Sequence, residues 1–242
     1  FRVMFFIHTT SKRYKCIKVY FTPSRNFLGS IKDLTILINI YFLKKITKKR
    51  FYLFAHIHGS SLNKFLNSNI YGNFCKKLYI KCKTKFIILS LIHKNFVMGN
   101  DYKNYFILPN PIDNDILEFS TSISKQSNSK KSKEKLIRVC FISNPLHDKG
   151  LKESIIWCNN LIRNLNWEFN VLGWKKNEFY KIYSNVSPSL SKLINEKVNF
   201  YGFIDGDKKF KILYESDIFI LLSKKEAQPL SILEAIFFKC FI

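Results

Sequence analysis

The second half of the chain alternates short apolar runs with stretches of helical periodicity. Its predicted strands are four runs rich in β-branched and aromatic residues, at positions 136–143, 168–172, 198–201 and 217–223. Helices are predicted over residues 150–165, 178–195 and 207–215 and from Pro229 onward. Within the second of these, Pro188 interrupts the helical pattern. Strands that alternate with helices indicate right-handed βαβ units and a parallel sheet buried on both faces.

The first half of the chain is compatible with the same organisation. Residues 30–44 have the pattern of a helix, and short apolar runs that fit strands occur at 16–21, 51–56, 85–90 and 105–108. Two α/β domains in tandem would place a ligand cleft between them, at the carboxyl ends of their strands. The pattern therefore predicts an α/β protein of two domains.

A segment rich in serine and lysine separates the two halves. Residues 119–135 read FSTSISKQSNSKKSKEK and contain almost no large apolar side chain after Ile123. Such a segment cannot bury enough surface to fold by itself. We interpret it as a linker between an N-terminal domain of residues 1–118 and a C-terminal domain of residues 136–242.

Forty lysine and arginine residues against 17 aspartate and glutamate residues give the chain a formal net charge of +23. Such an excess is typical of proteins that bind nucleic acid or an anionic membrane. Only six of the 40 basic residues are arginine, however, and lysine is among the residues that A/T-rich codons specify. The base composition of the gene is therefore an equal explanation for part of the charge. Residues 1–116 contain 20 basic and four acidic residues, so a functional basic surface would belong mainly to the first half.

Cysteine spacing and hydropathy argue against several classes of protein. The six cysteines include no C-x-x-C pair and no histidine at zinc spacing, so neither a metal site nor a small disulfide framework is indicated. We expect reduced thiols and a cytoplasmic location. The longest apolar run covers about ten residues, at 34–43, whereas roughly 20 are needed to cross a bilayer.

The loop and helix that follow the strand predicted at 217–223 carry the most informative chemistry. The loop contains Glu226, and Glu234 follows eight residues later on the helix. Pro229 suits the first helical position, where its missing N–H needs no partner. The positive helix end would then form an anion site from the free amides of Leu230, Ser231 and Ile232. Two carboxylates beside an anion site suit the hydroxyl groups that flank a diphosphate, as in a nucleotide sugar.

This segment resembles the donor-binding signature of glycosyltransferase family 4, retaining enzymes of the GT-B fold. Glu226 and Glu234 keep the E-x7-E spacing within SKKEAQPLSILEA, where the family commonly has E-G-Q-P-L-S-I-L-E-A. VNFYGF, LYESDIFILLS and RVCFISNPLHDKG are similar to the family's neighbouring strands and phosphate-binding loop. The resemblance implies an α/β fold of GT-B type, in which two Rossmann-like domains turn their parallel sheets toward a cleft.

Carried over residue by residue, the resemblance gives each motif position a role. Glu226 would bind the hydroxyls of the donor sugar and act in catalysis, and Glu234 would bind the ribose hydroxyls of the nucleotide. Lys149, in the DKG of the first loop, would neutralise the diphosphate as the leaving group gains charge. Main-chain amides for the same diphosphate would come from Leu230 and Ser231. No metal or cofactor is implied, because the lysine and the helix end do what Mg²⁺ does elsewhere.

In the first half, FYLFAHIHGSS places His58 and Gly59 after the strand predicted at 51–56. This segment is similar to the HxHG element of the acceptor-side domain of the same family. The resemblance implies that His58 faces the donor sugar and the attacking hydroxyl as a catalytic residue, and that Gly59 allows close approach to the backbone. His56, two residues earlier on the same strand, fits a structural role better.

The resemblance as a whole implies a cytoplasmic, retaining glycosyltransferase. It would move a hexose from a nucleotide diphosphate sugar to a glycan or a lipid-linked saccharide. An anionic membrane surface at the inner face of the membrane would be a further partner for the basic first half. A basic nucleic-acid-binding protein is a less favoured alternative, because arginine is scarce, and we expect no nucleic acid among the partners.

The resemblance covers only part of the family's architecture. It starts partway into the N-terminal domain and ends just after the E-x7-E helix, while the chain itself begins with Phe1 and ends in an apolar run, CFI. We therefore expect both domains to be incomplete, and a fragment of this kind to be unstable or inactive by itself. An inactive truncated remnant of such an enzyme is the corresponding alternative.

Overall fold

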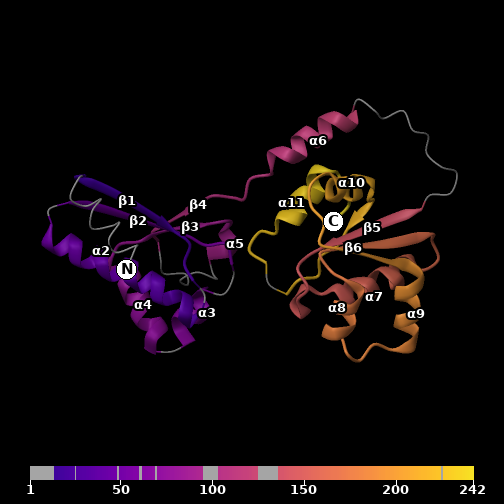
Figure 1. Cartoon of the computed structure of the whole chain (residues 1–242), viewed down its shortest axis with the longest axis horizontal. Coiled ribbons are helices and arrows are strands. Elements are labelled where there is room, and N and C mark those ends of the chain that lie inside the picture. Colours follow the sequence, from indigo (N-terminus) through magenta and orange to yellow (C-terminus); the bar gives the residue numbers. More distant parts are fainter. Residues whose placement is uncertain are drawn as a thin grey trace. The chain divides into compact units, whose positions relative to one another are not determined.

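The computed structural model describes residues 14–24, 26–47, 49–59, 62–68, 70–94, 103–124, 136–224 and 226–242. The chain divides into two compact units, each with its own parallel sheet (Figure 1). Unit 1 runs to Asn110 and also includes Glu226–Gln228. Unit 2 consists of Pro111–Lys225 and Pro229–Ile242.

Unit 1 contains a four-stranded parallel sheet in which the strands follow one another in chain order. The strands are β1 (Cys16–Phe21), β2 (Arg50–His56), β3 (Lys85–Ile88) and β4 (Tyr105–Ile107). The helices among the described residues of this unit are α2 (Phe27–Ile46), α3 (Leu62–Ser68), α4 (Ile70–Lys81) and α5 (Leu91–Lys94). All four strands predicted in the first half are confirmed, and the helix predicted at 30–44 is α2, extended at both ends.

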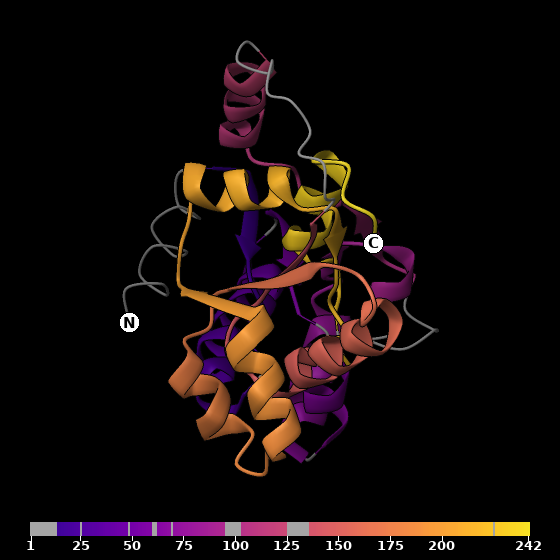
Figure 2. The same cartoon turned by 90° about the vertical axis from the view of Figure 1, so that its right-hand side faces the viewer.

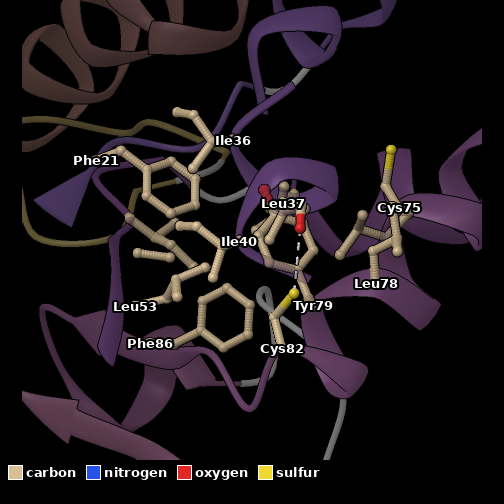
Figure 3. Close-up of a cluster of buried hydrophobic side chains, with 14 of the residues drawn as sticks. Phe21, Ile36, Leu37, Ile40, Leu53, Cys75, Leu78, Tyr79, Cys82 and Phe86 are labelled. Carbon is tan, nitrogen blue, oxygen red and sulfur yellow. Dashed lines mark hydrogen bonds between the residues drawn. The ribbon is translucent and has the colours of Figure 1, made fainter. Parts of the chain in front are cut away.

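The core of unit 1 lies between the sheet and helices α2, α3 and α4 (Figure 1). Figure 3 shows Leu37 and Ile40 of α2 beside Tyr79 of α4 and Phe86 of β3, all of them buried. The Sγ of Cys82 donates a hydrogen bond of 3.4 Å to the carbonyl oxygen of Leu37, which joins the end of α4 to α2. This apolar layer fixes the sheet and the loops at its carboxyl edge.

Unit 2 has a second parallel sheet, with strand order β7-β6-β5-β8. The strands are β5 (Ile137–Ile142), β6 (Trp167–Leu172), β7 (Val198–Gly202) and β8 (Ile218–Phe219). The helices are α6 (Asn114–Ser124), the short 3₁₀ helix η1 (His147–Lys149), α7 (Leu151–Ile162), α8 (Lys176–Ile182), α9 (Pro188–Lys197), α10 (Asp207–Glu215) and α11 (Leu230–Phe237). The α/β alternation predicted for the second half is confirmed.

Helices cover both faces of the sheet in unit 2, as Figures 1 and 2 show. Helices α7, α8 and α9 pack on one face, where Phe141 and Phe169 are fully buried. Helices α10 and α11 lie on the other face, over a smaller cluster that includes Cys140 and Leu213. The prediction of a sheet buried on both faces is therefore confirmed for unit 2.

The sheet of unit 1 differs from that of unit 2 in this respect. Alternate residues of β1 and β2 are buried and exposed, and the aromatic side chains on the face away from the core remain partly open to solvent. Tyr20 is 59%, Tyr52 38% and Phe106 48% exposed. The strands of this sheet thus have one apolar face and one mixed face.

Two element boundaries also differ from the predictions. The helical stretch predicted at 178–195 is two helices, because Pro188 begins a new helix at its first position, with Ser187 as the N-cap. The last predicted strand is shorter, since only Ile218 and Phe219 have strand geometry. The final apolar run does pair: Phe241 forms a parallel bridge with Ile218.

The predicted linker is partly helical. Its first six residues belong to α6, whose Phe119 ring packs 5.6 Å from the ring of Phe210 and 6.1 Å from that of Phe238. The rest of the predicted linker, residues 125–135, lies outside the described residues. The division between the two units also falls earlier than residue 118, at Asn110.

Candidate functional site

The loop after β5 brings Lys149 to the carboxyl end of the sheet in unit 2. Gly150 ends the 3₁₀ helix in a left-handed conformation, with φ of 74°, and a Cβ at this position would lie 2.1 Å from the carbonyl oxygen of Leu222. The carbonyl oxygen of Asp148 accepts a hydrogen bond of 2.9 Å from the amide of Lys224. The lysine loop is therefore fixed against the segment that follows β8.

A second glycine tightens the same edge of the sheet. Gly173, after β6, has φ of 86°, and a Cβ there would lie 2.2 Å from the carbonyl oxygen of Ser143. The next residue, Trp174, is fully buried and donates from its indole Nε1 to the Ser143 hydroxyl over 3.0 Å. The loops after β5 and β6 thus hold each other in place.

Helix α11 follows the loop after β8, and its first residues are those of the predicted anion site. Pro229 is the N-cap and Leu230 the first helical residue, one position later than predicted. The amide of Ile232 donates to the carbonyl oxygen of Pro229 over 3.2 Å, so it is not one of the free amides that the sequence predicted. Leu230 and Ser231 occupy the first turn, as predicted.

Glu234 lies in the second turn of α11 and is buried. Its Oε1 lies 3.1 Å from the Nζ of Lys209, on α10, and this ammonium is also 3.1 Å from Oδ1 of Asp205. Burial works to lower the pKa of Lys209, but the attraction of Glu234 and Asp205 outweighs it and raises the pKa above its usual value. Sequence patterns did not point to Lys209, which is 25 residues from Glu234.

Glu226 and Glu234 belong to different units of the structure. Glu226 belongs, with Gln228, to unit 1, whereas Glu234 belongs to unit 2. Within unit 1, the amide of Asn110 donates to Oε1 of Gln228 over 2.7 Å, and the Asn110 side chain donates to the carbonyl oxygen of Gln228 over 2.9 Å. These two bonds fix the loop that carries Glu226.

His58 lies beside a pocket of about 550 Å³ at the carboxyl end of the sheet in unit 1. The pocket is lined by the loop after β1, the first turns of α2 and the end of β2, namely by Thr22, Pro23, Ser24, Asn26, Gly29, Lys32, Ile57, His58 and Gly59. The loop is held by Asp33, whose Oδ2 accepts from the amide of Ser24 over 2.6 Å. Burial raises the pKa of Asp33. Both predicted acceptor-side residues, His58 and Gly59, are among the lining residues.

Three histidines lie in or beside the loop after β2, which carries His58 and Gly59. The ring of His58, which is exposed, lies 4.0 Å from the ring of buried His56, whose Nδ1 contacts the hydroxyl of Tyr20. Buried His93 accepts from the amide of Leu89 at Nδ1 over 3.1 Å, and its Nε2 is 3.1 Å from the carbonyl oxygen of Gly59.

The two backbone contacts assign His93 the neutral form with the proton on Nε2, because Nδ1 accepts and a carbonyl oxygen can only accept. Burial lowers the pKa of both His56 and His93, and the nearby His58 lowers them further. Neutral imidazoles are therefore the favoured forms at neutral pH. His93 was not singled out by its sequence context, yet it ties the loop of His58 and Gly59 to the end of β3.

The largest hollow described in unit 2 does not coincide with the predicted site residues, and the described residues form no metal-binding group. A hollow of about 800 Å³ runs along the edge strand β7 and is lined by Lys175, Lys176 and residues 198–203, so none of the predicted site residues lines it. In the described part of the chain, no group of three or more His, Cys, Asp or Glu side chains could hold a metal ion. Independence from metal stays a prediction.

Solved structures of glycosyltransferases share this fold at low sequence identity. A glycosyltransferase from Rickettsia africae matches with a TM-score of 0.62 and 17% identity, over 98% of this chain and 59% of the other. The lipopolysaccharide outer core galactosyltransferase WaaB matches with a TM-score of 0.60 and 16% identity, over 99% and 61%. Anabaena HepE, solved in complex with UDP and glucose, matches with a TM-score of 0.54 and 13% identity, over 99% and 61%. The chain thus has the predicted α/β architecture of GT-B glycosyltransferases and spans about three fifths of the length of these structures.

A comparison with curated protein sequences returns no match. The sequence model of the glycosyl transferases group 1, however, matches residues 122–242, which are half of the chain and include Lys149, Glu226 and Glu234. The chain therefore belongs to the family of glycosyl transferases group 1.

Proposed function

We propose that this chain belongs to a retaining glycosyltransferase of family 4, which moves a hexose from a nucleotide diphosphate sugar to a glycan or a lipid-linked saccharide. The observation that carries the proposal is the carboxyl edge of the sheet in unit 2. There the Lys149 loop is fixed against the segment after β8, which leads into α11 and the buried Glu234. A cation and a helix start at one sheet edge suit a diphosphate.

The donor would be held by groups of opposite character. Lys149 and the amides of Leu230 and Ser231 bind the diphosphate, while Glu234 accepts hydrogen bonds from the ribose hydroxyls and Glu226 from those of the sugar. The UDP and glucose bound to HepE support this class of ligand. No metal is needed for this arrangement, because the lysine and the helix start neutralise the diphosphate.

The reaction we propose is attack on the sugar from the face that the diphosphate leaves. The bond from the anomeric carbon to the diphosphate oxygen breaks, and a bond to the acceptor oxygen forms on the same side, with loss of the hydroxyl proton. Charge builds up on the diphosphate as it departs, so Lys149 and the first turn of α11 stabilise the transition state more than the ground state. His58, with Gly59, contributes on the acceptor side, where the pocket of unit 1 provides hydroxyl, amide and ammonium groups.

An anionic membrane is the second partner that we propose, and α2 supports it. Five exposed apolar residues of α2 lie on one side of the helix, within about 100° of one another at 100° per residue, namely Phe27, Leu28, Ile31, Phe42 and Ile46. The last turn adds Lys45 on the same side, whereas Lys44 donates to the carbonyl oxygen of Cys82. Apolar side chains beside a lysine suit a helix lying on an anionic bilayer. No described helix is long and apolar enough to cross a membrane.

The thiols support a reducing location at the inner face of that membrane. All six cysteines lie among the described residues, all six are free, and five of them are buried. Sedimentation with vesicles that contain phosphatidylserine checks the membrane partner: Leu28→Ser together with Ile46→Ser should reduce binding, and unchanged binding would exclude α2 as the contact.

Donor binding is the direct test of the proposed function. Calorimetric titration of the chain with UDP-, GDP- and ADP-sugars should yield one nucleotide class that binds, and Glu234→Ala should weaken it about ten- to hundred-fold by removing charged hydrogen bonds. Glu226→Ala should weaken the nucleotide sugar but not the free nucleotide. Glu215→Ala, on the exposed end of α10, is the matched control and should change neither.

Two outcomes would contradict the proposal. Indifference of sugar binding to Glu226→Ala would remove that residue from the donor site. Absence of binding for every nucleotide sugar, together with binding to generic DNA that falls steeply with salt, would favour the nucleic-acid-binding alternative.

A further inference from the structure

Lys209, on α10, is a partly buried cation that contacts Glu234. Its side chain is 16% exposed and that of Glu234 12%, and the Nζ to Oε1 distance is 3.1 Å. The second contact of the ammonium, to Oδ1 of Asp205, also spans 3.1 Å, but Asp205 is 66% exposed. The ammonium therefore bridges a surface carboxylate and a buried one.

The backbone around Lys209 is built to hold this position. Asp205 and Lys209 are four residues apart, on either side of Gly206, which starts α10 with φ of 60°. Helices α10 and α11 pack together through the rings of Phe210 and Phe238, whose centroids are 6.2 Å apart. The lysine thus leaves α10 directly toward the second turn of α11.

A buried carboxylate without a partner is costly, and it takes up a proton or turns away. Either change would remove the hydrogen-bond acceptor that Glu234 presents. The bond from Lys209 engages Oε1, so that Oε2 is the oxygen left to face a ligand. Fixing one oxygen also fixes the plane of the carboxylate, which sets the direction in which the other oxygen accepts.

We propose that Lys209 is a positioning residue of the donor site, which holds Glu234 by its Oε1 and aims its Oε2 at the ribose hydroxyls of the nucleotide. This inference rests on the proposed function, and it adds a residue outside the E-x7-E motif. It differs from a simple ion pair between α10 and α11, because a simple ion pair would affect folding without regard to the ribose hydroxyls of a ligand.

The test compares a nucleotide with its analogue that lacks the ribose hydroxyls. The probe is whichever of UDP, GDP and ADP binds the chain most tightly, together with its 2′,3′-dideoxy form. Lys209→Met should weaken the ribonucleotide about ten- to hundred-fold and the dideoxynucleotide less than about threefold, since the charged hydrogen bonds exist only with the first. Lys208→Met, an exposed neighbour on α10, is the control and should change neither affinity.

Equal weakening of both ligands would overturn the inference while leaving the proposed function intact. Failure of all three nucleotides to bind would instead overturn the proposed function, and this inference with it.

A second set of variants covers the case in which Lys209→Met fails to fold. Glu234→Gln removes the buried charge, so adding Lys209→Met to it should lower ribonucleotide affinity by less than about threefold beyond Glu234→Gln alone. Lys209→Arg should restore most of the affinity, since it keeps the charge. A large additional loss in the double variant would show that Lys209 does not act through Glu234.

Discussion

Both sheets of this protein are parallel and four-stranded, but they differ in what covers their faces. In unit 2, helices pack on both faces, and most residues of β5 and β6 are buried regardless of the face to which they point. In unit 1, the strands alternate, with an apolar core on one face and partly exposed tyrosines on the other. Strand sequences therefore report the environment of each face separately, and an apolar run alone does not establish a doubly covered sheet.

The largest difference between the two sheets should be the loss of stability when an aromatic side chain is removed from a covered face and from an open one. Phe141→Ala in β5 should lower the free energy of unfolding of unit 2 by about 3–5 kcal/mol, because the ring is fully buried and leaves a cavity. Tyr52→Ser, on the open face of β2, should cost about 1 kcal/mol or less. Urea unfolding followed by circular dichroism measures both, and equal losses would contradict the difference between the faces.

The glycine after η1 should show the next largest effect. Gly150→Ala should destabilise unit 2 by about 1–3 kcal/mol, because the φ of 74° disfavours a side chain and the Cβ would collide with the Leu222 carbonyl. Since the Lys149 loop would have to move, nucleotide affinity should fall as well.

Gly202→Ala is the matched control for this prediction. Its φ of 66° is also positive, but a Cβ there would meet only the Lys175 side chain, at an ordinary contact distance of 3.5 Å. Its cost should therefore come from the backbone alone, about 1–3 kcal/mol, and nucleotide affinity should not change. Unfolding and calorimetric titration measure the pair, and an equal loss of nucleotide affinity in both variants would show that the close approach of Gly150 to Leu222 is unimportant.

The eight strands could be predicted from the sequence because each is a short apolar run between polar segments. Helices α3 and α4 were not predicted, and α4 contains Gly72, a residue type that weakens a helical pattern. In the structure that glycine lets α4 approach α3, where a Cβ would lie 2.2 Å from the carbonyl oxygen of Phe65. Close contact between two helices is a tertiary fact that local patterns do not contain.

Helix α6 was missed for a different reason. Its serines and threonine suggested a linker, yet the hydroxyls of Ser120, Thr121 and Ser122 each donate to the carbonyl oxygen three residues earlier. Side-chain bonds of this kind satisfy the polar groups within the helix. Phe119 then supplies the apolar contact, through rings that are distant in sequence.

The candidate site, like the fold, could be predicted only in part from the sequence. The positions of Leu230, Ser231 and Glu234 on one helix follow from spacing, and Lys149 follows from its loop motif. The contacts that hold the site do not follow from sequence patterns, because each joins residues that are distant in the sequence: Lys209 with Glu234, Asn110 with Gln228, and His93 with Gly59. Motifs predict which side chains would meet a ligand, whereas packing decides what holds them in position.

The smallest expected difference between the two units is in the pH dependence of their stability. Burial lowers the pKa of His93 and of His56 in folded unit 1, so the unfolded chain takes up protons at a higher pH than the folded unit does. Their contribution to stability is therefore complete above the usual pKa of 6.5 and is lost as the pH falls from there toward the lowered value. All three tryptophans, Trp157, Trp167 and Trp174, belong to unit 2.

Tryptophan fluorescence thus follows unit 2, while circular dichroism follows both units. Between about pH 8 and about pH 5.5 the urea midpoint seen by circular dichroism for unit 1 should fall more than the midpoint seen by fluorescence. The raised pKa of Asp33 acts in the opposite direction, so His93→Gln, which keeps an amide donor and acceptor but does not titrate, isolates the histidine. This variant should flatten the pH dependence of unit 1. Parallel shifts of both midpoints, unchanged in the variant, would show that His93 does not limit the acid stability of the loop that carries His58.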